Sequence, residues 1–120
     1  MDSAERQIKK QRERKARAAM KAVALRRTTI TYSDFLDEID WNVTPNGPQL
    51  RDLLCKISAT SLKSEGILLS AVVVNADGNR KGIPGPGFFE FAVNEGFEIS
   101  DERRFWHEEV EKAYLVGAAS

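Results

Sequence analysis

The chain has 120 residues, of which 42% are hydrophobic and 30% charged, so it suits one domain with one core and excludes two separate cores. No run approaches the eighteen apolar residues of a membrane-spanning helix, and the single cysteine excludes an internal disulfide, so we expect a soluble cytoplasmic protein without membrane contact. The net charge of zero hides an asymmetry. Residues 1–27 hold ten Lys or Arg against three acids, which gives +7, and the other 93 residues carry −7.

The basic N-terminal segment is predicted to form a helix from Ser3 to about Arg27, because it is rich in Ala, Arg, Lys, Gln and Glu and lacks Gly and Pro. Its apolar positions have helical spacing but are mostly small, so we expect the first half to stand free of the body. We therefore divide the chain into a basic helical arm, 1–28, and a compact winged-helix-like domain, 29–117.

Two shorter helices are predicted next. A brief extended piece around Ile30 leads into an amphipathic helix over 31–39, which either Thr31 or Ser33 can cap. After the break at 44–48, a second helix is expected from Pro48 to about Leu62, with Leu50, Leu53, Leu54 and Ile57 facing inward. Gly66 should end it.

Residues 67–74, with three consecutive valines, are predicted to form a core strand that is buried on both faces. The Asn, Asp and Gly residues of 75–79 favour a turn, and 82–87 is interpreted as a rigid turn that brings Phe88 and Phe89 to the core. Helices over 88–94 and about 100–116 complete the chain. The predicted fold is α+β, mainly helical, with a small sheet or hairpin in a winged-helix-like arrangement and a long basic N-terminal helix.

A family resemblance follows from the order of these elements. Three features follow one another in the chain: the motif Thr31-Tyr32-x-x-Phe35, a helix carrying Leu50-Arg51, and a strand ending in Val-Val-Asn-Ala-Asp-Gly at 73–78. In this order they resemble the winged-helix DNA-binding half of alkylguanine-DNA alkyltransferases and alkyltransferase-like proteins. The resemblance covers about residues 30–90. In that family a Pro-Cys-His-Arg motif precedes the valines and its cysteine takes the alkyl group. This chain has Leu-Ser-Ala-Val at 69–72, so the resemblance implies the scaffold without the transferase chemistry.

The segment 68–92 also looks like a small uncharacterised family found in actinobacterial and phage genomes, which implies no mechanism.

Among the residues themselves, no nucleophile or acid–base pair is arranged for catalysis, so an enzyme is only the third alternative. We expect no cofactor and no metal site, because His107 is the only histidine and has no second ligand cluster. Cys55 lies among Leu53, Leu54 and Ile57 of the predicted helix and is interpreted as a small core residue.

The leading hypothesis is a non-enzymatic nucleic-acid-binding or accessory regulatory protein. Clustered Lys and Arg release counterions when they meet phosphates, and a basic loop tip would act as a wing. DNA is favoured over RNA. The alternative is a protein-binding module, such as a small phage or host inhibitor or adaptor, whose basic helix docks on an acidic partner or on a second copy in a homodimer. The candidate nucleic-acid-binding residues are Lys9, Lys10, Arg12, Arg14, Lys15, Arg17, Lys21, Arg26, Arg27, Arg51, Lys56, Arg80 and Lys81.

Overall fold

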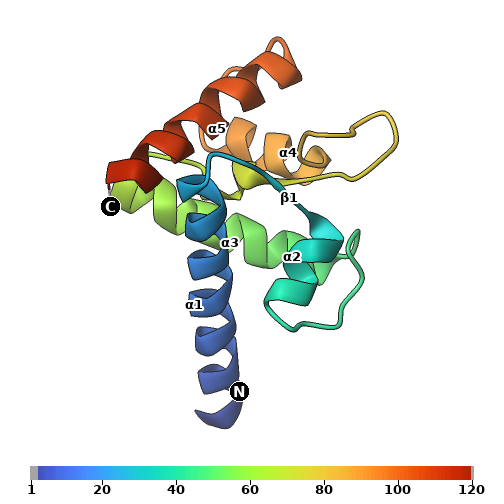
Figure 1. Ribbon diagram of the computed structural model, residues 1–120, viewed down its shortest axis with the longest axis vertical. Helices are drawn as coiled ribbons and strands as arrows, with labels where there is room; N and C mark the ends of the chain where they lie inside the picture. Colours follow the sequence, from blue (N-terminus) through green and yellow to red (C-terminus); the bar gives the residue numbers. More distant parts are fainter. Residues whose placement is uncertain (1–2, 120) are drawn as a thin grey trace.

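Helices surround a small parallel sheet in the computed structural model, which describes residues 3–119 (Figure 1). The two strands pair in parallel, with Ile30 opposite Val73 and Thr31 opposite Val74. The predicted α+β, mainly helical class is confirmed. In chain order the elements are α1 (Ser3–Leu25), β1 (Ile30–Thr31), α2 (Tyr32–Glu38), α3 (Pro48–Glu65), the 3₁₀ helix η1 (Leu69–Val72), β2 (Val73–Val74), α4 (Pro86–Asn94) and α5 (Glu102–Ala119).

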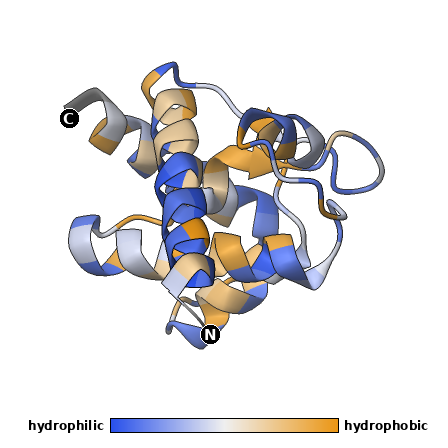
Figure 2. Ribbon diagram, turned by 90° about the horizontal axis from the view of Figure 1, so that it is seen from below, coloured by the Kyte–Doolittle hydropathy of each residue, from blue (hydrophilic) through white to orange (hydrophobic). Residues whose placement is uncertain are grey.

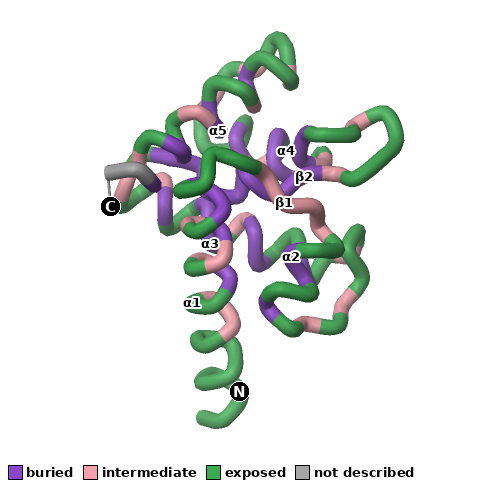
Figure 3. The backbone as a smooth tube through the Cα atoms, viewed as in Figure 1, coloured by how far each residue is buried: buried purple, intermediate pink, exposed green. Residues whose placement is uncertain are grey.

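The two halves of α1 have different surroundings. Residues 3–11 are all exposed, and this end of the helix projects beyond the other elements (Figures 1 and 3). The helix contacts α5, η1, α2 and α3, and its buried residues begin at Ala16. The core therefore extends into α1 well before residue 28, where the sequence placed the boundary between arm and domain. The residues that α1 buries are Ala16, Met20, Val23 and Ala24.

The helix ends follow the capping residues in the sequence. Thr31 Oγ1 accepts a hydrogen bond of 3.3 Å from the Asp34 N–H at the start of α2. Pro48 begins α3 at a position where its missing N–H costs nothing. Gly66 ends α3 in the left-handed conformation, with φ of 73°, and its N–H donates to the last turn. These boundaries confirm the predicted start and end signals.

The core strand predicted over 67–74 is wrong in its conformation, although every residue of that segment is buried. Leu69–Val72 forms a 3₁₀ helix, and only Val73 and Val74 are extended. Two serines of α3 explain the difference. Ser61 Oγ accepts from the Leu69 N–H at 3.1 Å and Ser58 Oγ accepts from the Ser70 N–H at 3.0 Å, so hydroxyls satisfy these backbone groups in place of a neighbouring strand.

The interpretation of the Gly-Pro loop as a structural turn is confirmed by the aromatic residues that follow it. Phe88 and Phe89 are buried, with ring centroids 5.1 Å apart and edge to face, and both approach Phe105 of α5. Trp106 donates from Nε1 to the Ala71 carbonyl at 2.7 Å and ties α5 to η1. The strand drawn as an arrow in Figure 2 is hydrophobic and lies among the helices. Of the helices within residues 3–119, none is both long and apolar enough to cross a membrane.

Candidate nucleic-acid interface

The first half of α1 carries cations that the rest of the described chain does not neutralise. Its exposed side chains reach solvent because no other element packs against residues 3–11. Five of the predicted phosphate-binding residues between positions 9 and 17 have side chains that make no ion pair, hydrogen bond or ring contact within residues 3–119, namely Lys9, Lys10, Arg14, Lys15 and Arg17. Arg17 is half-buried, and the other four are exposed.

Other charged groups attach α1 to the body. The Arg12 guanidinium lies 4.3 Å from the centroid of the Trp41 ring, just beyond α2. Lys56 Nζ of α3 lies 3.0 Å from Glu13 Oε1, and Lys21 Nζ lies 3.7 Å from an oxygen of Glu65. Arg12, Lys56 and Lys21 were all predicted to meet phosphate. Each instead has a partner within the molecule.

A second attachment holds the turn after α1. Arg27 has a φ of 53°, its Nη2 donates to Glu111 Oε2 at 2.9 Å, and its guanidinium lies 5.2 Å from the Tyr114 ring centroid. The Tyr114 hydroxyl donates to the Thr28 carbonyl at 3.0 Å. Burial, and secondarily the Glu111 carboxylate, raises the pKa of Tyr114. Of the two predicted arginines in this turn, Arg27 is engaged, whereas Arg26 is exposed and unpaired in the part of the chain that is described.

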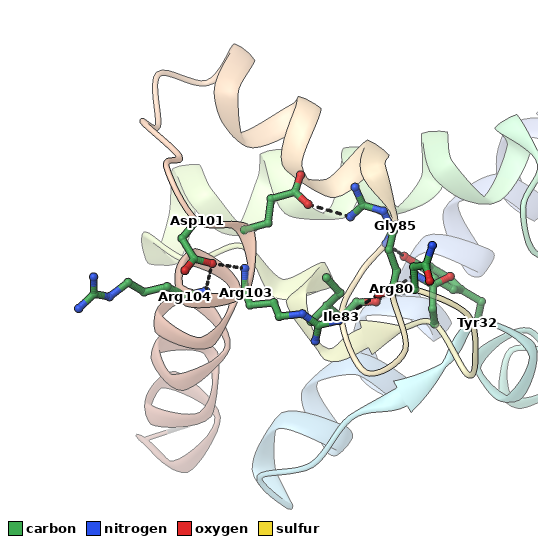
Figure 4. A network of polar contacts seen from close by, with 10 residues as sticks. Tyr32, Arg80, Ile83, Gly85, Asp101, Arg103 and Arg104 are labelled. Atoms are coloured by element: carbon green, nitrogen blue, oxygen red, sulfur yellow. Dashed lines mark hydrogen bonds and ion pairs between the residues drawn. The ribbon is translucent and has the colours of Figure 1, made fainter.

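The predicted wing is tied to the start of α5 (Figure 4). Arg80 Nη1 lies 3.1 Å from Glu102 Oε1, and its guanidinium lies 5.6 Å from the Phe89 ring centroid. Arg103 Nη2 donates to the Asn79 carbonyl at 3.1 Å. The loop closes through a single bridge between Asn75 and Lys81 rather than through a paired β-hairpin. Lys81 is exposed, so only one of the two predicted cations of the tip is available.

Arg51 borders a cleft of about 290 Å³ that the sequence did not reveal. Its side chain crosses the start of α4, where a Cβ on Gly87 would lie 2.9 Å from Arg51 Cδ, so only glycine fits there without a shift. The cleft is formed by segments that are distant in the sequence, and no local pattern announces it. Among its lining residues are Tyr32, Leu54, Cys55, Ser70, Asn75 and Phe91.

Burial raises the pKa of two groups that line the cleft, Tyr32 and Cys55. The Tyr32 hydroxyl accepts from the Gly85 N–H at 2.7 Å, and burial raises the pKa of Tyr32. Burial, followed by the charge of Asp52, raises the pKa of the Cys55 thiol, which is half-buried at the cleft wall rather than inside the core as predicted. A raised pKa disfavours the reactive thiolate.

The resemblance expected from the sequence aligns Ser70 with the alkyltransferase cysteine. Ser70 lies at the cleft wall, with its Oγ 2.6 Å from Ser58 Oγ. His107, the only histidine of the sequence, belongs to α5 and is not among the residues that line the cleft. Residues 3–119 also contain no group of three His, Cys, Asp or Glu arranged to hold a metal ion.

Comparisons with protein-family models, with curated proteins and with solved structures find no match for this chain.

Proposed function

We propose that this protein is a non-enzymatic nucleic-acid-binding protein that contacts phosphates through the first half of α1. The observation that supports this function best is the cluster of five cations without partners in the described chain, four of them exposed on the part of α1 that precedes its buried residues and the fifth, Arg17, directly after the first of those residues. An exposed cation without a partner is still hydrated, and no ion pair has to be broken before it binds a phosphate.

The charge of the remaining surface restricts how nucleic acid approaches. α4, α5 and the turn between them expose acids without ion pairs in the described part of the chain, including Glu90, Glu95, Glu98 and Glu108. This surface repels a polyanion, so the molecule is oriented with α1 forward. In the same proposal, the loop 75–85 acts as the wing of a winged-helix arrangement and presents Lys81, while Arg80 fixes the loop on α5.

Binding to mixed-sequence duplex DNA, single-stranded DNA and RNA over a series of salt concentrations tests the proposal. Five phosphate contacts predict that the logarithm of the binding constant falls with the logarithm of salt concentration with a slope of about −4.5 for duplex DNA. A variant in which Lys9, Lys10, Arg14, Lys15 and Arg17 are changed to Gln should lose that slope. Glutamine keeps the helix propensity, so the fold is retained.

Two single-charge variants, one in α1 and a matched control in α5, separate the effect of α1 from that of net charge. Lys15→Gln in α1 should weaken binding and lower the slope by about one, whereas Arg104→Gln in α5 should leave both unchanged. Equal effects of the two variants would show that only net charge matters. Absence of binding at low salt would refute the proposal and favour an acidic protein partner for α1, which retention of the wild type but not the five-residue variant on an acidic polypeptide would then support.

A further inference from the structure

One side of α1 carries a row of three polar side chains and one alanine. Gln7, Gln11, Arg14 and Ala18 follow one another at intervals of four, three and four residues, so they form one row along the helix. All four are exposed. The buried residues of α1, which begin at Ala16, lie on the opposite side of the helix, so the row faces directly away from the body.

Basic residues lie on both sides of this row. By helical spacing, Lys10 and Arg17 are on one side and Lys15 is on the other, and none of them has a partner in the described chain. An α-helix with its side chains is about 10–12 Å across, and the major groove of B-DNA is about 12 Å wide. A helix that enters this groove has a phosphate strand on each side, which matches cations on both sides of a central row.

The side chains of the row are those that read base edges. Glutamine donates and accepts a pair of hydrogen bonds with adenine, arginine donates two to guanine, and the alanine methyl contacts that of thymine. From Gln7 to Ala18 the helix rises about 16 Å, roughly the height of four or five base pairs. Lysine residues alone would neutralise phosphates, but a row with two glutamines adds groups that are suited to bases.

We propose that α1 is a recognition helix, whose row of Gln7, Gln11, Arg14 and Ala18 enters the major groove of duplex DNA and reads four or five base pairs. Lys10, Arg17 and Lys15 contact the two phosphate strands beside it. This inference rests on the proposed function. It assigns Arg14 to a base edge in place of a phosphate, and it adds a preference for duplex over single strands and for certain sequences over others.

Selection from a pool of random duplexes by the full chain tests the inference. We expect an enriched motif of four or five base pairs that contains a guanine read by Arg14. Arg14→Lys keeps the charge but removes the planar fork, so it should reduce the preference for that guanine on the order of tenfold, with the salt slope unchanged. Gln11→Ala should relax the preference at one adenine. Lys10→Gln should weaken binding to all sequences by the same factor.

Two experiments on the selected duplex test whether α1 binds in the major groove. Methylation of guanine N7, which faces the major groove, should prevent binding, whereas netropsin in the minor groove should not displace the protein. Salt-dependent binding without an enriched motif, or displacement by netropsin with no effect of N7 methylation, would overturn the recognition helix and leave phosphate binding intact. Absence of binding to any nucleic acid would overturn the proposed function itself, so the two failures are distinguishable.

Discussion

The two halves of α1 belong to one continuous helix, yet they differ in composition and lie in different parts of the molecule. Around Lys9 and Lys10 no element covers the helix, whereas Met20 and Ala24 are buried against α5, η1 and α3. The difference shows that helix propensity alone is enough to predict the helix, but not the use of each half. The buried half anchors the helix, and the exposed half is left to present its charge.

The largest expected effect comes from core truncation in the buried half. Met20 is completely buried, so Met20→Ala should lower the free energy of unfolding by about 2–5 kcal/mol through lost contacts and a cavity. Ile8 of the exposed half retains 53% of its accessible surface, and Ile8→Ala should change the stability by less than about 0.5 kcal/mol. Urea unfolding of both variants measures the contrast. Similar losses would mean that both halves are packed.

A smaller effect is expected where α3 supports η1. Ser61 Oγ lies 2.7 Å from the Ile67 carbonyl and accepts from the Leu69 N–H, both in buried surroundings. Ser61→Ala leaves these groups unpaired and should cost about 1–3 kcal/mol. Ser64→Ala is the matched control, because the exposed Ser64 hydroxyl only donates back to the Thr60 carbonyl. Equal melting temperatures of the two variants would show that η1 does not depend on this serine.

The smallest effect concerns Tyr32 and alkaline pH. Burial raises the pKa of Tyr32, so the folded state favours the protonated hydroxyl. Its contribution to stability is therefore complete below the ordinary tyrosine pKa of about 10 and is lost as the pH rises through the raised value. Tyr32→Phe should cost about 1 kcal/mol at pH 7, because the Gly85 N–H loses its acceptor.

The same variant should also lose less stability than the wild type between pH 8 and pH 11. Thermal unfolding across this range measures the difference. Parallel curves for the two proteins would contradict a buried, protonated Tyr32.

Features encoded within a few residues were predictable from the sequence. Thr31, Pro48 and Gly66 act on their own helix ends, and the valines at 72–74 signal burial wherever their backbone goes. The conformation of 69–72 was not predictable, because it depends on hydroxyls of α3 that lie twelve and eight residues away.

The candidate site also has some features that the sequence predicts and others that it does not. Positive charge on α1 is visible in the composition, and helical spacing places Gln7, Gln11 and Arg14 in one row. The partners that occupy Arg27 and Arg80 come from α5, far along the chain, so no local pattern indicates which cations are engaged. The cleft beside Arg51 is likewise assembled from separate segments.

The most direct test is to map amide and side-chain NMR shifts of the full chain as duplex DNA is added. The account predicts that the shifts concentrate on residues 6–18 of α1, with the Arg14 guanidinium and the Gln11 side-chain amide among the largest. Residues 90–98, which carry the acids at the end of α4 and in the turn after it, should be unaffected. Shifts centred on the cleft around Tyr32 and Arg51, with α1 unchanged, would contradict the claim that the first half of α1 is the nucleic-acid-binding surface.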